Sequence, residues 1–380
     1  MAGPMRALAI ACVATLALIA IGVVLFAWRY GGGERFPDLT TDPELPASAL
    51  EVVADLDSPP GNIAVSASGR ILFSFHPEAS PPVQVAELVN GTPQPYPPGG
   101  IGDGLDYQSV LAVRIDRQNR FWVLDNANHG SGTPRLLAFD LNTDARVHRF
   151  DFPREIAGLG SHLNDFQVSA DGNRIYIADA SIFAKTPALI VYDVATRSAR
   201  RLLEGHRSVA PEYFVPHVQG QRMVIFGIFA IRPGVDSIAL DRRGEWLYFA
   251  AVTSRTMYRV RRADLDDAAL SPAALAKRVE AHAPKTMSDG ITTDLMDNIY
   301  LSDPDESAIV LLTADGRLRT LLKDAKLRWP DGFSFGPNGW LYVTCSALHH
   351  VIMRSADHIR DRAPYQIFRF RPGFEGIPGQ

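Results

Sequence analysis

The chain has 380 residues, 46% of them hydrophobic and 21% charged, which is typical of a globular protein with a large core. Its formal net charge of -4, with no basic stripe along any segment, argues against a nucleic-acid-binding protein. One of the two cysteines lies in the N-terminal apolar segment, which excludes an internal disulfide scaffold, a CxxC redox pair and a thiolate zinc site.

The first predicted element is an apolar helix. Ala7 to Trp28 form a run of 22 residues without a charged side chain. As an α-helix this run would be about 33 Å long, enough to cross the hydrocarbon core of a bilayer. It ends in Phe26, Trp28 and Arg29 rather than in the small residues of a cleavage site. We therefore expect residues 1–30 to be an uncleaved membrane anchor, with a cleaved signal peptide as the alternative.

A polar segment follows the anchor. Its sequence, GGGERFPDLTTDPELP, is rich in glycine and proline, and we expect residues 31–48 to form a flexible linker. Residues 49–380 then form the folded domain. An export segment at the N-terminus places this domain in the periplasm or extracellular space, either anchored to the membrane or secreted.

A sequence phrase recurs six times through the folded domain. Each copy is an alternating apolar run, a turn of Asp, Gly, Asn or Ser, and a second run rich in aromatic and β-branched residues, as in PDGFSFGPNGWLYVT. This pattern predicts two antiparallel strands joined by a tight turn, and in several copies a third strand follows. The copies open at Asn62, Ser109, Asn164, Asp236, Asp289 and Asp331.

The spacing of the copies predicts the architecture. Consecutive openers are 42 to 55 residues apart, except for one interval of 72. A four-stranded propeller blade takes about 40–50 residues, so the long interval contains an insertion, predicted as a loop on one face. The predicted fold is therefore all-β, a six-bladed β-propeller preceded by an N-terminal transmembrane helix; two stacked β-sandwiches fit the single period less well.

Two further elements are predicted. A ring of blades leaves no open sheet edge only if the first and last blades are joined, so the strand near residues 49–56 is expected to complete the final blade beside residues 365–371. The one helix predicted within the domain spans Asp264 to Glu280.

The openers are the candidate functional residues, because the start of each innermost strand lies at one mouth of the central channel. Crowded carboxylates there would repel one another and raise one another's pKa unless a cation compensated them. Calcium accepts carboxylate and amide oxygens together. The alternative is that each Asp or Asn only caps its own turn. We predict calcium ligands at Asn164, Asp236 and Asp289, and contacts to a small-molecule ligand at Asn62, Ser109 and Asp331.

Two residues are candidates for proton transfer. Asp289 is one, and His162 lies two positions before Asn164, near enough to reach the mouth as a general acid or base. The sequence contains no GxSxG, HExxH, P-loop or dinucleotide-binding motif. No nucleotide or redox cofactor is therefore expected.

Several segments resemble the major royal jelly protein and yellow family, in the family's order. They include SVLAVRIDRQNRFWVLDNA with PRLLAFDLNTDARVHRFDFP, then GVDSIALDRRGEWLYFAAV, then WPDGFSFGPNGWLYV, between Ser109 and Val343. The resemblance implies a six-bladed propeller, usually secreted, with a small-molecule pocket at the channel mouth. Some members bind biogenic amines, and some are named for dopachrome conversion (L-dopachrome tautomerase-related). The chain lacks the paired cysteines of insect members, so it resembles a bacterial branch.

A wider resemblance is to the calcium-dependent gluconolactonase propellers. Asn164, Asp236 and Asp289 match the ion's ligands there in type and order, although an Asn is usual at the position of Asp236. The glutamate that the first blade supplies in that group has no counterpart, since Asn62 stands in its place.

Three functions remain open from the sequence. The first is a module that binds a small polar or aromatic molecule at the channel mouth. The second is a calcium-dependent lactonase or esterase, and the third is a scaffold that binds proteins through its outer faces. Whether the chain is an enzyme, by hydrolysis or by tautomerase-like chemistry, stays open. The expected partners are a small-molecule ligand and the membrane, with no nucleic acid, and the chain is expected to be a monomer.

Overall fold

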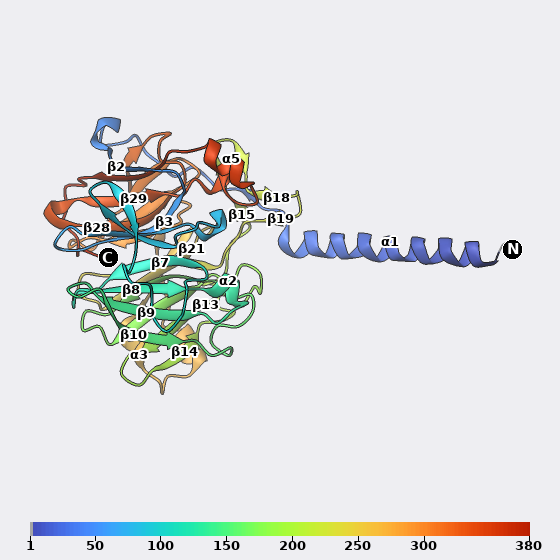
Figure 1. Ribbon diagram of the computed structural model, residues 1–380, viewed down its shortest axis with the longest axis horizontal. Coiled ribbons are helices and arrows are strands. Elements are labelled where there is room, and N and C mark those ends of the chain that lie inside the picture. The colour runs from blue at the N-terminus through green and yellow to red at the C-terminus, as the bar shows by residue number, and fades with distance from the viewer. Residues whose placement is uncertain (1–2) are drawn as a thin grey trace.

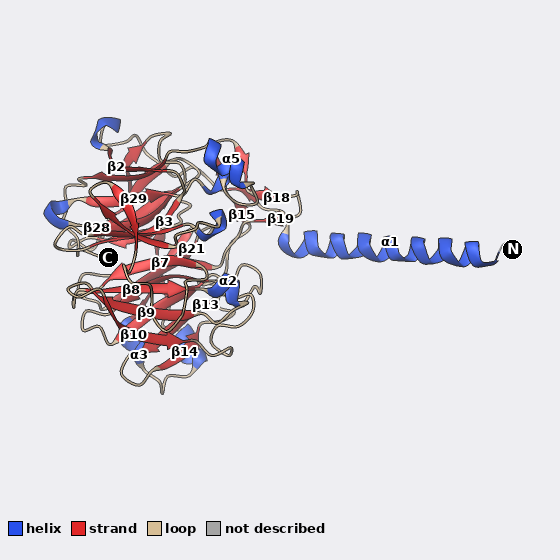
Figure 2. Cartoon of the chain, in the orientation of Figure 1, coloured by secondary structure: helices blue, strands red, loops and turns tan. Residues whose placement is uncertain are grey.

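The computed structural model describes residues 3–380 as an apolar helix and a β-domain. Helix α1 (Gly3–Tyr30) projects away from the domain (Figure 1). Its stretch Arg6–Tyr30 is 25 residues long and apolar enough to cross a membrane, and none of its side chains is fully buried, although Ala27 and Tyr30 at its end are partly covered. The domain itself is built almost entirely of strands, with short helices at its edges (Figure 2).

Within residues 3–380, six four-stranded antiparallel sheets form the domain. The first three are β3 (Pro60–Val65), β4 (Ile71–Phe75), β5 (Val85–Val89) and β6 (Thr92–Pro95); β7 (Val110–Ile115), β8 (Arg120–Asp125), β9 (Arg135–Asp140) and β10 (Ala145–Asp151); and β11 (Leu163–Val168), β12 (Arg174–Asp179), β13 (Ala188–Asp193) and β14 (Ser198–Leu202). The last three are β20 (Val235–Leu240), β21 (Trp246–Ala251), β22 (Thr256–Arg261) and β23 (Glu280–Pro284); β24 (Ile291–Thr293), β25 (Ile299–Asp303), β26 (Ala308–Leu312) and β27 (Leu318–Lys323); and β28 (Pro330–Phe335), β29 (Leu341–Cys345), β30 (Tyr365–Phe370) and β2 (Glu51–Leu56).

The sheets are arranged in a ring. The first strands of the six sheets, β3, β7, β11, β20, β24 and β28, contact one another in that order, and β28 returns to β3. The predicted six-bladed propeller is therefore confirmed. Its closure is also confirmed, since β2 pairs with β30 from Glu51 opposite Arg369 to Leu56 opposite Tyr365.

The insertion forms short hairpins on one face. Its strands are β15 (Phe214–Val215), β16 (His217–Val218), β17 (Gln221–Arg222), β18 (Val224–Ile225) and β19 (Phe229–Ala230). In Figure 1, β15, β18 and β19 lie on the side from which α1 projects, as do the short helices α2 (Ala127–Gly130) and α5 (Ala356–Asp361). At the other end of the inner strands, the carbonyl oxygens of Gly379 and Gln380 accept hydrogen bonds from the backbone N–H groups of Ile115 in β7 and Phe335 in β28.

The long helix expected over Asp264 to Glu280 is wrong. Two short helices are present instead, α3 (Arg262–Asp266) and α4 (Pro272–Ala276). Pro272 cannot donate a backbone hydrogen bond and is tolerated only in a first turn, so the chain starts a new helix there. The Ser271 hydroxyl accepts from the backbone N–H of Ala274 and caps that new start.

The segment expected to be a flexible linker, residues 31–48, is held against the propeller. Strand β1 (Glu34–Arg35) pairs with β15. Phe36 is only 4% exposed and packs beside Val252 and Met287. Further along, Thr41 exchanges two hydrogen bonds with Thr320 of β27. Several apolar side chains and backbone hydrogen bonds, among them those of Leu45, thus order a segment whose composition indicates a loose tether.

Candidate functional site

A cavity of about 490 Å³ lies at the channel mouth on the face that carries the insertion. Five of the six openers line it, and so does His162. These lining residues are Ser109, Asn164, Asp236, Asp289, Asp331 and His162. The structure thus brings together side chains that five different blades contribute.

Local strand geometry turns the openers toward the channel axis. In five of the innermost strands the pairing register shifts near the N-terminal end, for example between Val235 and Ser237 in β20 and between Leu163 and Phe166 in β11. Such a bulge leaves a residue outside the regular ladder and re-aims its side chain. Asp236 and Asn164 occupy these bulged positions and are 6% and 7% exposed.

Three aspartates form the polar floor of the cavity. Burial, and then the charges of Asp289 and Asp331, raises the pKa of Asp236 well above its usual range. Burial and the charge of Asp289 do the same to the pKa of Asp331. Burial raises the pKa of Asp289 to about 6, although the indole N–H of Trp329 donates to its Oδ2 and opposes the rise. Without a cation, the floor favours bound protons over three negative charges.

Asn62 does not line the cavity. Its Oδ1 accepts a hydrogen bond from Arg114, and its Nδ2 lies 3.4 Å from an oxygen of Asp165. Arg114 Nη2 donates to both oxygens of Asp165 at 2.8 Å, so a buried ion pair fills the channel next to Asn62. With the backbone N–H of Ile63, which also donates to Oδ1, the Asn62 side chain has three partners within the protein.

One wall of the cavity is a cluster of histidines that sequence reasoning did not assemble. His129 and His162 have ring centroids 4.5 Å apart, and His129 Nε2 lies 3.6 Å from Glu78 Oε1. Burial lowers the pKa of His162 to about 3 and that of His76 to about 4, so both imidazoles are neutral near pH 7. The hydrogen bond with His129 holds the pKa of Glu78 below its usual range.

Glu78 is a first-blade glutamate that lines the cavity from the loop after β4 rather than from the start of β3, where Asn62 stands. The only sequence signal for it is the polar segment HPE directly after the apolar run ILFSF. Loop residues carry no periodicity, so neither Glu78 nor His129 could be placed at the mouth in advance.

Lys285 is a further buried charge near the floor. Its Nζ donates to the carbonyl oxygens of Val252 and Thr286 at 3.1 and 2.9 Å and to the Ser288 hydroxyl at 3.0 Å. Burial lowers its pKa to about 7, although the charges of Asp303 and Glu212, and to a smaller extent those of Asp236 and Asp289, favour its charged form. This lysine partly balances the aspartates.

The outer part of the cavity is apolar. Its side chains come from α1, the loop between β12 and β13, the insertion and the loop before α5. They are Phe26, Ile182, Phe183, Ile225, Phe226, Ile228, Phe229, Ile231, Leu348, Ile352 and Met353. The cavity therefore combines an acidic floor with a hydrophobic upper wall, an arrangement that suits a ligand with a cationic or hydrogen-bond-donating group on an apolar body.

The floor has the donor chemistry of a calcium site. Asn164, Asp236 and Asp289 offer the hard oxygen atoms that calcium prefers. Among the described residues, no group of three or more His, Cys, Asp or Glu side chains is already placed as a metal-ligand set.

Comparisons with known proteins agree with the fold and identify the family. Residues 108–332 match the model of the major royal jelly protein family. Major royal jelly protein 7 of Apis mellifera is 30% identical over 181 residues, which are 44% of this chain and 39% of that relative. Major royal jelly protein 3 of Apis mellifera is 28% identical over 44% of this chain and 31% of its own length. The chain thus matches less than half of the length of these relatives.

Solved structures with a similar fold have low sequence identity. A gluconolactonase of Xanthomonas campestris has a TM-score of 0.53 at 12% identity, covering 90% of this chain and 97% of that one. Regucalcin of Agrobacterium tumefaciens, a calcium-binding protein, has a TM-score of 0.53 at 15% identity, covering 87% and 97%. A luciferin-regenerating enzyme has a TM-score of 0.55 at 12% identity, covering 87% and 97%. These likenesses concern the fold alone. The family model, in contrast, covers more than half of the sequence, and the protein is a member of the major royal jelly protein family.

Proposed function

We propose that this protein is an exported, membrane-tethered propeller that binds a small polar or aromatic molecule in the cavity at its channel mouth. The observation that carries the proposal is the convergence of Asp236, Asp289 and Asp331 below an apolar wall. Three carboxylates with raised pKa values are poorly compensated within the protein. A cationic ligand group would stabilise their ionised forms.

The walls favour a ligand with an aromatic or apolar body. Trp329 lines the cavity and donates to Asp289, so its indole lies beside the carboxylate floor. An ammonium group at the floor would then hold an attached ring against Trp329 and the phenylalanines above it. Aromatic amines combine both features, as do the biogenic amines bound by some members of the family.

Thermal unfolding of the full chain in detergent tests this proposal. Tyramine should raise the melting temperature, because a ligand that binds only the folded state at 100 times its Kd adds about 2.7 kcal/mol of stability. 4-Ethylphenol, which lacks the amine, should raise it much less. Asp289→Asn should reduce the tyramine shift, whereas Asp315→Asn, an exposed control beside Arg317, should leave it unchanged. No shift with any amine or polar aromatic compound would contradict the proposal.

The second candidate function is a calcium-assisted lactonase or esterase. It is favoured by the hard-oxygen donors from neighbouring blades and by Asp289, whose pKa of about 6 suits proton transfer near neutral pH. His162, neutral and in the same cavity, is the alternative proton acceptor. Calcium, when bound, would polarise a substrate carbonyl.

Calcium and a chelator distinguish the two candidates. If the ion is part of the site, calcium raises the melting temperature and supports turnover of lactones or aryl esters, and Asp289→Asn abolishes both effects. If the melting curves with calcium and with chelator superimpose and none of these substrates turns over, the hydrolase candidate is excluded while the tyramine result still stands.

A further inference from the structure

The cavity opens beside the end of the apolar helix. Phe26, in the last turns of α1, itself lines the cavity. The rings of Phe26 and Tyr30 lie against Phe229 of the insertion, with centroids 6.1 and 5.6 Å apart. Tyr30 also donates a hydrogen bond of 2.9 Å to the carbonyl oxygen of Phe183. The helix that can span a membrane thus forms part of the cavity wall.

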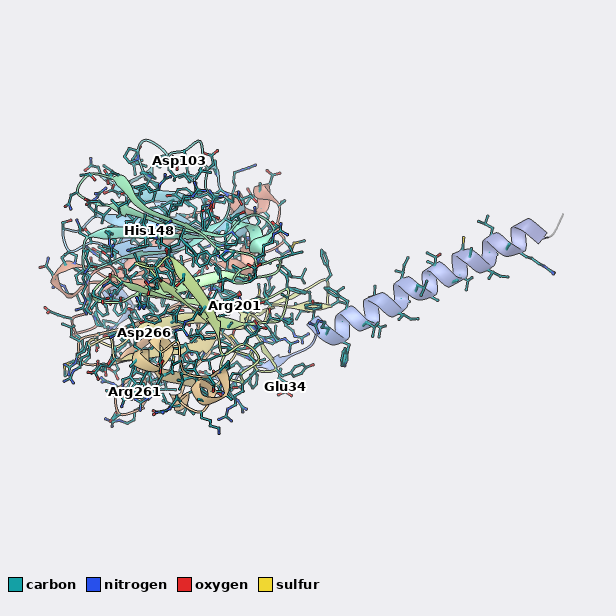
Figure 3. All side chains as sticks on the ribbon, turned by 90° about the horizontal axis from the view of Figure 1, so that it is seen from below. Glu34, Asp103, His148, Arg201, Arg261 and Asp266 are labelled. Carbon is teal, nitrogen blue, oxygen red and sulfur yellow. The ribbon has the colours of Figure 1, made fainter. Side chains whose placement is uncertain are left out.

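The junction between α1 and the propeller is closely packed. Arg232 Nη2 donates to the carbonyl oxygen of Gly31 at 2.8 Å. A Cβ atom at Gly31 would lie 2.4 Å from the carbonyl oxygen of Ala27 and 3.0 Å from that of Ile228, so only glycine fits between helix and insertion. Strand β1 follows immediately, and Figure 3 shows Glu34 beside the point where α1 leaves the domain. These contacts fix the position of the cavity mouth next to the C-terminal end of α1.

The rim of the mouth has the composition of a membrane interface. Phe226 is 80%, Met353 65% and Phe183 45% exposed, and all three also line the cavity. Trp28, near the end of α1, is 82% exposed. Lys185 lies nearby, with its Nζ 5.4 Å from the ring centroid of Tyr30. Exposed aromatic and apolar side chains beside basic ones are typical of surfaces that lie in the lipid headgroup region.

We propose that the mouth of the cavity lies on the bilayer surface and that the cavity takes an amphiphile directly from the membrane. The inference rests on the proposed function and assigns its ligand class: an apolar chain that passes Phe183, Phe226 and Met353, and a cationic or hydrogen-bond-donating head group at the aspartate floor. The order of polarity, from apolar rim to acidic floor, matches an amphiphile that enters head first. It also explains why the exposed apolar residues surround the mouth.

Site-directed spin labelling tests where the mouth lies. The full chain, with Cys12→Ser to remove the exposed native thiol, is placed in nanodiscs of phosphatidylcholine and phosphatidylglycerol. Single cysteines that carry a nitroxide label replace Phe226 and Met353 at the rim and, as a control, the exposed Met296. Met296 lies near the C-terminal segment, since the backbone N–H of its neighbour Leu295 donates to the carbonyl oxygen of Glu375. The rim labels should be accessible to oxygen and protected from a water-soluble nickel chelate, and the Met296 label should show the reverse. Equal exposure of all three labels to the nickel chelate would overturn the proposal.

Photolabelling tests the ligand class in the same nanodiscs. Hexadecylamine with a diazirine in its chain should label peptides that contain Phe183, Phe226 or Met353, in addition to α1. Excess tyramine should suppress the labelling of the propeller. Asp289→Asn should lower the labelling of the propeller about tenfold, which corresponds to a loss of roughly 1.4 kcal/mol of head-group binding. Asp315→Asn should leave this labelling unchanged. Labelling of α1 alone would overturn the proposal.

The outcomes separate this inference from the proposed function. If tyramine stabilises the chain but hexadecylamine labels only α1, the binding site stands and delivery from the membrane is wrong. If neither compound binds, the proposed function fails as well. If the rim labels lose mobility only when unlabelled protein is added in excess, the apolar rim is an interface between two copies of the chain instead.

Discussion

At the scale of single residues, the floor of the cavity is electrostatically costly. Asp236, Asp289 and Asp331 all have raised pKa values, mainly because they are buried. For a carboxyl group whose pKa is higher in the folded state than in the unfolded chain, the folded state holds extra protons between the two values. Stability therefore falls as pH rises through that window.

Asp289 gives the clearest pH prediction, because its pKa rises from 3.8 to about 6 on folding. Asp289→Asn should make the ligand-free protein more stable at pH 7.5 by about 1–2 kcal/mol, and the gain should vanish near pH 4. Chemical denaturation at several pH values measures it. Buried histidines such as His162 act in the opposite direction below pH 6.5, but they are present in both proteins and cancel in the difference. A gain that is independent of pH would contradict this account.

The buried pair in the channel gives a second prediction. Arg114→Met leaves Asp165 buried without its partner, which should cost about 3–5 kcal/mol of unfolding free energy. The double variant Arg114→Met with Asp165→Leu should recover most of that loss, since neither member of the pair then leaves an unpaired buried charge. Arg317→Met, which removes an exposed pair with Asp315, should cost at most about 1 kcal/mol. Equal losses in the single and double variants would show that volume rather than charge matters at this position.

At the scale of elements, the sequence predicts what is periodic. Six copies of one phrase predict six blades, and the need to close the ring predicts the pairing of β2 with β30. Five openers lie at the mouth because each begins an innermost strand. Asn62 does not line the cavity; its Oδ1 accepts a hydrogen bond from Arg114 on the inner strand of the next blade. No pattern in the sequence predicts this contact.

Elements without periodicity could not be predicted. Glu78 and His129 reach the cavity from loops, and the apolar wall comes from two-residue strands of the insertion, too short to show alternation. The segment 31–48 is held in part by Phe36, whose partners Phe214, Val252 and Met287 are far from it in the sequence. The glycine and proline residues there indicate a loose segment, and the composition does not show that Phe36 finds these partners.

Phe36 therefore gives a prediction for this segment. Phe36→Ala removes a buried ring and should lower the unfolding free energy by about 3–5 kcal/mol or detach the segment. Detachment would appear as rapid trypsin cleavage after Arg35, which is protected only while β1 stays paired. Glu44 lies in the same segment and forms an exposed ion pair with Arg319 of β27. Glu44→Ala should lower the unfolding free energy by at most about 1 kcal/mol and leave cleavage after Arg35 slow. Fast cleavage of the unaltered chain would show that the segment is a loose tether.

At the scale of the whole molecule, the propeller brings residues that are distant in the sequence together around one axis, and in our proposal α1 places the mouth of that axis at the membrane. The insertion and α1 lie on the same side of the domain as the cavity mouth (Figure 1). Gly379 and Gln380 bond to the far ends of β7 and β28. A ligand that enters by the mouth passes the apolar rim before it reaches the aspartates.

The most direct test of the central claim, that the converged aspartates form a ligand site, is calorimetric titration of the full-length protein with tyramine. We expect one site per chain, and a loss of affinity of about tenfold, or ~1.4 kcal/mol, when either Asp236 or Asp289 is changed to Asn. Asp315→Asn should bind as the unaltered chain does. Equal affinities in all four proteins, or no binding of any amine, would contradict the account.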